Sequence, residues 1–330
     1  MSGALRPLVR LHAVSRDFDV SRPWLNRVLE GVPRQLLRAV DGVSFELRRG
    51  ETLALVGESG CGKSTVARLI VGLHAPSAGR IEFDGVDLAS PGASSLRRRM
   101  QMIFQDPYAS LNPRWRVRDI VAEPIRVLGV ARSKSEIDER VAEQLRQVRL
   151  APEDGEKYPH EFSGGQRQRI SIARALSGKP EFLVCDEPTS ALDVSVQAQI
   201  LNLMVALQGG LGLTYLFISH NLAVVSHVAD RVGVMYLGRL VELAEAGELF
   251  ARPRHPYTRM LLDAIPDLAM SGRRRTPVSG EVPNPLDPPA GCAFHPRCPH
   301  AGARCRSERP LPFADGPSLV ACHAVQEGRI

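Results

Sequence analysis

The sequence predicts an α/β fold in which helices flank a buried and mostly parallel β-sheet. Three observations predict it. Strand-like apolar runs alternate with helical patterns along most of the chain. Two of these runs, Glu181–Cys185 and Leu213–Ser219, are unbroken, which is typical of parallel strands buried on both faces. A glycine-rich segment at Gly57–Ser64 stands between a strand-like run and a helical pattern, which is the context of a phosphate-binding loop.

Composition excludes several classes of protein. With 330 residues, 44% hydrophobic and 24% charged, the chain is neither wholly disordered nor collagen-like. The net charge of +6 suits nucleic acid, an anionic membrane surface or a phosphate-rich ligand, and selects none of them. Six cysteines are too few for a secreted disulfide scaffold. No signal peptide is expected, and the chain is predicted to be soluble and cytoplasmic.

Strands and helices are predicted in order along the first third of the chain. Thr52–Val56 is a short apolar run that leads into glycines, so it is predicted as a strand, with a helix over Lys63–His74. Gly79–Phe83 runs into the turn signal Asp84-Gly85 and is predicted as a strand, as is Gln101–Phe104.

The uncharged stretch Val194–Ser219 is long enough to raise the question of a membrane span. It contains several Asn and Gln residues and the glycine-rich segment Gly209–Gly212, so a helix, a turn and a buried strand are predicted instead. Further along, Val232–Tyr236 and Arg239–Leu243 flank Leu237-Gly238 and predict a hairpin.

Two composition changes predict the domain organisation. Residues 107–160 are helical in pattern and more charged, as in Ser133–Leu150, and are predicted to form a helical lobe. Residues 271–330 contain ten of the 25 prolines and four of the six cysteines. We therefore expect one nucleotide-binding domain over residues 1–270 and a Cys/Pro-rich extension over residues 271–330.

A phosphate-binding loop is the first chemical motif. The segment reads Gly57-Glu58-Ser59-Gly60-Cys61-Gly62-Lys63-Ser64, with Thr65 after it. Glycines let successive backbone N–H groups wrap the phosphates, and the helix N-terminus adds partial positive charge. Lys63 is expected to reach the terminal phosphates, and the Ser64 hydroxyl to be a Mg²⁺ ligand. The alternative is a chance glycine-rich turn, which the flanking strand and helix disfavour.

Two carboxylates form the second motif. Asp186 and Glu187 stand at the carboxyl end of the apolar run that precedes them, where ligands of open α/β sheets bind. Asp186 is predicted to hold Mg²⁺ through water, and Glu187 to orient and polarise the attacking water. The alternative is a solvated strand end, which the phosphate-binding loop earlier in the chain disfavours.

A second anion-binding device lies between these motifs. Ser163-Gly164-Gly165-Gln166 opens a helix predicted over Arg167–Leu176, and N–H groups at a helix start attract anions. Two phosphate cradles in one domain suggest that the second serves a neighbour's nucleotide. The segment closely resembles the signature motif of ABC ATPases, and Ser190–Asp193 resembles their D-loop.

The resemblance to ABC ATPases covers about residues 8–265 and implies the roles of three more residues. Gln105 resembles the Q-loop glutamine, which contacts Mg²⁺ and the membrane partner in that family. His220 resembles the switch histidine, which holds the γ-phosphate and positions the water. Phe18 is the candidate for stacking on adenine, with simple packing as the alternative.

Three further segments resemble the peptide-permease branch of these ATPases, which includes oligopeptide, dipeptide and nickel importers. They are Phe104–Arg114, Tyr158–Glu161 and His255–Thr258. The resemblance implies a peripheral subunit at the cytoplasmic face of the inner membrane that binds and hydrolyses MgATP to drive peptide import. The implied partners are a second ATPase subunit (a paralogue or a second copy), two transmembrane permeases and, indirectly, a substrate-binding protein.

Two other functions stay open at this point. One is import of nickel or another small solute, and the other is a nucleic-acid-associated ABC ATPase. A single phosphate-binding loop, with no C-x-x-C module and no long coiled coil, disfavours the latter, so no nucleic acid is expected.

The extension carries a cluster of cysteines in sequence, namely Cys292, Cys298, Cys305 and Cys322. Their spacing is not that of a zinc ribbon or finger. Four thiolates suffice for a [4Fe–4S] cluster, which is favoured here over zinc. The alternative is four reduced thiols in a loosely packed extension.

Overall fold

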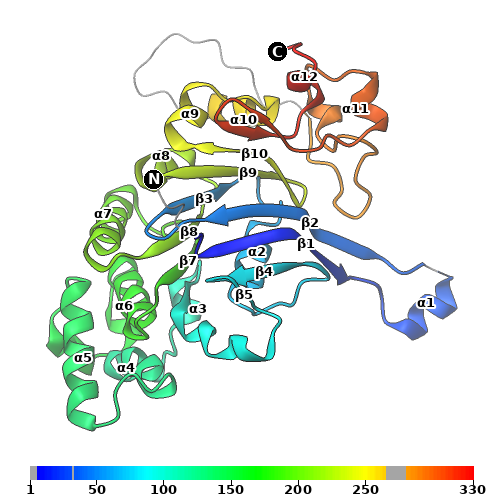
Figure 1. Cartoon of the computed structure of the whole chain (residues 1–330). Helices are drawn as coiled ribbons and strands as arrows, with labels where there is room; N and C mark the ends of the chain where they lie inside the picture. Colours follow the sequence, from blue (N-terminus) through cyan, green and yellow to red (C-terminus); the bar gives the residue numbers. More distant parts are fainter. Residues whose placement is uncertain (1–5, 32, 265–279) are drawn as a thin grey trace. The chain divides into compact units, whose positions relative to one another are not determined.

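The computed structural model describes residues 6–31, 33–264 and 280–330 (Figure 1). Its chain divides into two compact units. The first unit comprises Met1–Val9, Leu47–Thr52 and Glu82–Ser219. The second comprises Arg10–Glu46, Leu53–Ile81 and His220–Ile330. The domain boundary expected at residue 270 lies outside the described residues.

A parallel three-stranded arrangement forms the centre of the first unit. The strands are β6 (Met100–Ile103), β7 (Phe182–Asp186) and β8 (Thr214–Ile218), with β7 in the middle. Every position of β7 and β8 is buried. The two unbroken apolar runs are therefore parallel strands covered on both faces, as predicted. A short hairpin joins the end of β4 to β5 (Val86–Asp87).

The first unit also contains helices. They are α3 (Pro107–Ser110), α4 (Val117–Val127), α5 (Lys134–Gln147), α6 (Gly164–Ser177) and α7 (Val194–Leu211), with short 3-10 turns η1 (Pro91–Ser94), η2 (Leu96–Arg99), η3 (Pro152–Glu156) and η4 (Pro159–Glu161). Within the unit, α4 and α5 both pack on α6 (Figure 1). A capping box between Ser133 and Glu136 fixes the start of α5.

Helix α7 corrects one prediction. We predicted a break at Gly209–Gly212, but α7 continues through the first two glycines and ends at Gly212, whose left-handed φ of +66° closes it. Helix α7 is long and apolar enough to cross a membrane, but the core helices of soluble proteins meet the same two criteria. One side of it is buried, at Ile200, Leu201, Leu203, Met204 and Leu207, as in a core helix.

The second unit contains two groups of strands. In one, β2 (Leu36–Leu47), β1 (Val9–Asp19) and β4 (Ala78–Phe83) lie in that order, and α1 (Trp24–Glu30) joins β1 to β2. In the other, the order is β11 (Phe313–Asp315), β12 (Ser318–Val320), β10 (Arg239–Glu245), β9 (Arg231–Tyr236) and β3 (Thr52–Val56). Strands β3 and β9 are parallel, and β9 and β10 form the predicted hairpin.

The helices of the second unit are short. They are α2 (Lys63–Ile70), α8 (Leu222–Val228), α9 (Ala246–Ala251), α10 (Pro256–Asp263), α11 (Ala303–Ser307) and α12 (His323–Gln326), with the turn η5 (His295–Arg297). Helix α2 ends at Ile70, four residues before the predicted end.

The C-terminal lobe, defined here as residues 280–330, is part of the second unit's sheet. Strand β12 pairs antiparallel with β10 through Glu242 opposite Val320 and Leu243 opposite Leu319. The Ala321 N–H also donates to the Val241 carbonyl at 2.9 Å. Because this lobe adds strands to a sheet and buries Val320, its described residues are not loosely packed, while the alternative of four reduced thiols stays open.

Candidate functional site

The phosphate-binding loop lies between β3 and α2, and its glycines are required by their neighbours. Gly57 and Gly62 have φ of +149° and +105°. A Cβ at Gly57 would lie 2.2 Å from the Met235 carbonyl oxygen, and one at Gly62 would lie 2.3 Å from that of Ala39. Only glycine fits either position, so β2 and β9 fix the course of the loop.

Lys63 begins α2 and is folded into the loop. It is 5% exposed, and its Nζ donates to the carbonyl oxygens of Gly57 at 2.8 Å and Glu58 at 3.0 Å. A buried ammonium surrounded by carbonyl dipoles at a helix start forms a site for phosphate oxygens. Burial raises the pKa of the neighbouring Cys61 thiol, which therefore stays protonated at neutral pH. Four further predicted residues, Ser59, Gly60, Ser64 and Thr65, belong to the same loop and first helical turn.

Two residues that the sequence did not single out as site residues hold Glu58 of this loop. Arg297 donates from both terminal nitrogens to the Glu58 carboxylate, at 2.7 and 2.9 Å. The Glu58 N–H donates to the Tyr257 hydroxyl at 2.9 Å. No local pattern could have predicted the contact with Arg297, since 239 positions separate the two residues.

The His255-Pro256-Tyr257 segment, besides supplying the Tyr257 contact with Glu58, forms the start of α10. His255 Nδ1 accepts from the Tyr257 N–H at 3.0 Å and so caps α10, while the buried Glu242 accepts from the His255 N–H at 2.9 Å. Burial first, and then the charge of Arg259, lowers the pKa of His255 to about 3. The neutral imidazole thus fixes the start of the helix that carries Tyr257.

In the first unit, the structure brings Gln105 and Glu187 together. Asp186 ends β7 and is 3% exposed. Glu187 follows with φ of +46°, a conformation that costs a side-chain-bearing residue roughly 1–3 kcal/mol and that is concentrated at functional sites. The Glu187 N–H donates to the Ile218 carbonyl at 3.0 Å, and Gln105 Nε2 donates to Glu187 Oε2 at 3.1 Å. The backbone conformation of Glu187 and the hydrogen bond from Gln105 therefore orient the Glu187 carboxylate.

The predicted switch histidine, His220, is exposed and follows β8 by two residues. Directly after it, the Asn221 side chain accepts from the N–H groups of Ala223 at 3.0 Å and Val224 at 3.4 Å. This cap fixes the start of α8 and with it the backbone next to His220.

The signature segment opens α6 with a capping box. The Ser163 hydroxyl accepts from the Gln166 N–H at 3.4 Å, and Gln166 Oε1 accepts from the Ser163 N–H at 3.0 Å. A Cβ at Gly165 would lie 2.4 Å from Val196 Cγ1 on α7, whereas Gly164 has room for one. Ser163 therefore has a structural role as a helix cap, and Gly165 has one in close packing against α7. Both roles are independent of any contact with a nucleotide.

Phe18 lies on β1 and has ring partners within its unit. The Arg16 guanidinium lies 4.7 Å from the centre of its ring, and the His74 ring meets it edge-on at 5.4 Å. One face of the aromatic ring therefore carries a cation, and stacking on adenine stays a prediction.

The four cysteines of the C-terminal lobe are not in disulfides. Burial first, and then the charges of Cys305, Cys322 and Cys298, raises the pKa of Cys292 to about 11. The Cys292 N–H donates to the Cys305 carbonyl at 2.9 Å. Among the described residues, however, no three Cys, His, Asp or Glu side chains are grouped as a metal site.

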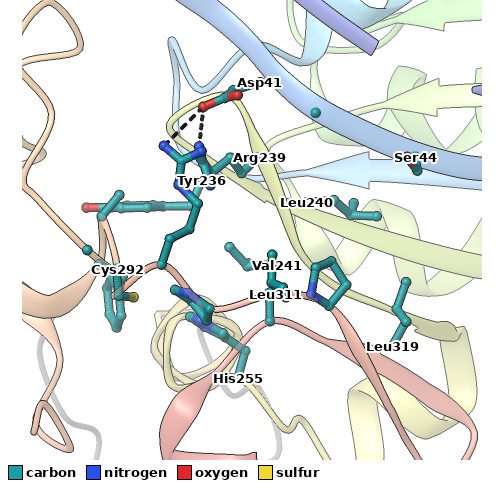
Figure 2. A pocket seen from close by; sticks show the side chains of 18 residues that line it. Asp41, Ser44, Tyr236, Arg239, Leu240, Val241, His255, Cys292, Leu311 and Leu319 are labelled. Carbon is teal, nitrogen blue, oxygen red and sulfur yellow. Dashed lines mark hydrogen bonds and ion pairs between the residues drawn. The ribbon is translucent and has the colours of Figure 1, made fainter. Parts of the chain in front are cut away.

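A cavity of about 350 Å³ lies between the β9–β10 hairpin and the C-terminal lobe (Figure 2). Arg239 forms an ion pair with Asp41 at its edge, and Cys292 and His255 line it. The cavity contains none of the phosphate-loop residues, and the sequence did not predict it.

Comparisons with known proteins agree with this fold. The ABC transporter family matches residues 40–190, and the family described as oligopeptide/dipeptide transporter, C-terminal region, matches residues 241–305. Among solved structures, cbiO1 of Clostridium perfringens, part of an ABC transporter complex, has a TM-score of 0.63 and 29% identity and covers 74% of this chain and 91% of its own. An ATP-binding cassette bound to ADP and Pi has a TM-score of 0.61 and 26% identity, covering 72% and 98%. The fold is therefore that of an ABC ATPase, as predicted.

Curated relatives match nearly the whole chain. The di/tripeptide transport ATP-binding protein DppF of Pseudomonas aeruginosa is 53% identical over 95% of this chain and 96% of its own. The dipeptide transport ATP-binding protein DppF of Escherichia coli is 51% identical over 98% and 96%. The chain belongs to the ABC transporter family, in the branch that carries the oligopeptide/dipeptide transporter C-terminal region.

Proposed function

We infer that this chain is the ATP-hydrolysing subunit that energises ABC-type import of di- or oligopeptides. The observation that carries this inference is the identity of about half of all residues, along nearly the whole chain, to ATP-binding proteins of peptide transport. The match of residues 241–305 to the peptide-transporter C-terminal region supports it, and no comparable observation favours nickel or nucleic acid.

The site residues divide the chemistry between them. Lys63 and the N–H groups of the phosphate-binding loop hold the phosphates of ATP, and the ring of Phe18 stacks on its adenine. Ser64 and Gln105 would hold Mg²⁺ through their side-chain oxygens, and Asp186 would hold it through water. Oxygen donors are the ligand type that this ion prefers, and it would neutralise phosphate charge there. Glu187 orients the attacking water.

His220 holds the γ-phosphate and positions that water. Phosphoryl transfer of this kind depends mainly on positioning and charge stabilisation, with no covalent enzyme intermediate. The contact between Gln105 and Glu187 supports the proposal, because it couples a Mg²⁺ donor to the residue that aims the water.

The ATPase works in a larger assembly. A second ABC ATPase subunit, a paralogue or a second copy, presents its nucleotide to the signature segment Ser163–Gln166. Two transmembrane permeases hold the chain at the cytoplasmic face of the inner membrane as a peripheral subunit, and a substrate-binding protein acts through them. Family membership supports this arrangement.

The cysteines of the C-terminal lobe, Cys292, Cys298, Cys305 and Cys322, are proposed to bind a [4Fe–4S] cluster. The donor type fits, since a [4Fe–4S] cluster takes four thiolates and the lobe carries four cysteines. They are not grouped as a metal site in the structure, so the thiols must close around the cluster. Anaerobic purification with a visible spectrum and iron, sulfide and zinc analysis tests this. Zinc alone, or a colourless protein without metal, contradicts it.

Replacement of Glu187 by Gln tests the assignment of the hydrolytic site. The variant keeps the shape of the side chain but loses its charge, so ATP binding is expected to stay within about threefold of wild type. Turnover is expected to fall at least about 100-fold, the scale of a positioned general base. Both are measured in the transporter reconstituted with its permeases, where labelled dipeptide uptake must stop. Wild-type hydrolysis in this variant refutes the role of Glu187.

The substrate class is tested in the same reconstituted transporter. ATP-dependent uptake of a labelled dipeptide is expected, and uptake of nickel ions is not. Salt-dependent binding of the subunit to DNA or RNA at physiological ionic strength, without peptide uptake, overturns the proposed function.

A further inference from the structure

Each polar group of Glu58 in the phosphate-binding loop, namely its carbonyl, its N–H and its carboxylate, forms a hydrogen bond. Its carbonyl oxygen accepts from Lys63 Nζ at 3.0 Å, and its N–H donates to the Tyr257 hydroxyl at 2.9 Å. Its carboxylate accepts both terminal nitrogens of Arg297, at 2.7 and 2.9 Å. The position of this one residue therefore depends on the loop itself, on α10 and on the C-terminal lobe.

Arg297 is placed for this contact by burial and by aromatic packing. Its side chain is only 2% exposed, while that of Glu58 is 25% exposed. Phe294, three residues earlier, packs against the rings of Tyr236 at 5.3 Å and Tyr257 at 5.4 Å. The hydrogen bonds to Glu58 come first among the causes that raise the pKa of Arg297, so the guanidinium stays charged. A charge buried this deeply requires an ionic partner, and Glu58 supplies it.

The Glu58 carboxylate would otherwise oppose the function of the loop. It stands one residue from Gly57 and beside Lys63, in a cradle that binds a polyanionic ligand. An uncompensated negative charge there would repel phosphate groups. The bidentate contact with Arg297 neutralises the carboxylate and, through Glu58, restrains the backbone that accepts from Lys63.

We propose that Arg297 of the C-terminal lobe is a positioning residue for ATP binding, which acts by neutralising and orienting Glu58 of the phosphate-binding loop. This proposal rests on the proposed phosphate-binding role of the loop. It gives the lobe a function in the ATPase: seating of the lobe determines the affinity of the loop for nucleotide. The turn η5 that carries Arg297 is followed directly by Cys298.

Replacement of Arg297 by Gln tests the proposal. The dissociation constant of a fluorescent ATP analogue, measured without hydrolysis, is expected to rise at least tenfold. KM for ATP is expected to rise by the same factor in the reconstituted transporter, with kcat changed less than twofold, since Arg297 touches no reacting group. Arg297→Lys keeps the charge but loses the two-pronged contact, and is expected to show an intermediate loss.

The matched control is Arg304→Gln in the same lobe. Arg304 also pairs with a carboxylate, Glu308, but at the surface, with 40% and 54% of the two side chains exposed. This variant is expected to bind ATP like wild type. Equal losses in the two Gln variants, or wild-type affinity in Arg297→Gln, overturn the proposal.

A double variant separates the charge effect from misfolding. Glu58→Gln combined with Arg297→Gln removes both charges and leaves no stranded carboxylate, so it is expected to recover at least fivefold of the lost affinity. If Arg297→Gln does not fold, Arg297→Lys and the double variant still test the proposal. A double variant that binds ATP no more tightly than Arg297→Lys contradicts the charge argument. Failure of the wild-type protein to bind ATP refutes the proposed function itself, which is a different result.

Discussion

His255 shows how burial of a single side chain sets a property of the molecule. It is 1% exposed and acts as a hydrogen-bond acceptor at the start of α10, a role that only the neutral ring can fill. Its pKa falls from 6.5 to about 3 on folding, mainly through burial. Below pH 6.5 the unfolded chain therefore binds a proton that the folded chain does not, and stability decreases as the pH falls.

This linkage predicts a pH dependence of the free energy of unfolding. Between pH 7.5 and pH 5 the His255 contribution is expected to fall by about 2 kcal/mol, since each pH unit below 6.5 costs about 1.4 kcal/mol. His255→Asn keeps an acceptor that caps the helix but does not titrate, so it should lose that much less over the same range. Urea denaturation at several pH values measures both proteins. Parallel pH profiles of the two proteins would show that His255 does not titrate in this way.

Secondary-structure elements were predictable where local chemistry determined them. The runs that became β3, β7 and β8 ended within about one residue of the prediction because turn and helix signals bound each of them. The continuation of α7 through Gly209 was not predictable, since its tertiary packing outweighs the cost of about 1 kcal/mol for a glycine in a helix.

Contacts between distant elements were the least predictable part of the site. The phosphate-loop residues and the Asp186-Glu187 pair follow from motif spacing, and Gln105 followed only from the family resemblance. Arg297 and Tyr257 contact Glu58 across 239 and 199 positions, and nothing in either local sequence encodes that distance. Only the fold of the second unit brings the three together.

The α6–α7 contact allows the structural and ligand-related reasons for Gly165 to be separated. Gly165→Ala places a Cβ 2.4 Å from Val196 Cγ1, so it is expected to cost about 1–3 kcal/mol of stability, as overpacking does. Val196→Ala in the same chain removes the clash and should restore most of that stability. If the signature segment also contacts a nucleotide, ATP turnover in the double variant stays well below wild type. Full recovery of turnover would mean that Gly165 serves packing alone.

Within the second unit, the C-terminal lobe contacts the nucleotide-binding part in several places, and two of these contacts matter most for the phosphate-binding loop. One is the β10–β12 ladder, and the other is the Arg297–Glu58 ion pair. The first is a set of backbone hydrogen bonds between β10 and β12. The second includes Glu58, a residue of the phosphate-binding loop itself. The coupling between the two sites is reciprocal. If the seated lobe increases the affinity of the loop for ATP, bound ATP must stabilise the seated lobe by the same free energy.

This reciprocity predicts a measurable effect far from the nucleotide. Backbone amides of β12 are expected to exchange hydrogen more slowly when ATP is bound, by the same factor by which Arg297→Gln weakens ATP affinity, because both quantities report one coupling free energy. Hydrogen exchange read by mass spectrometry over residues 313–322, with and without a non-hydrolysable ATP analogue, measures it. In Arg297→Gln the protection at saturating analogue should disappear while the β10–β12 pairing persists, and in Arg304→Gln it should be retained. Protection that survives in Arg297→Gln would assign the coupling to the β10–β12 ladder, and the ion pair would then serve only to seat the lobe.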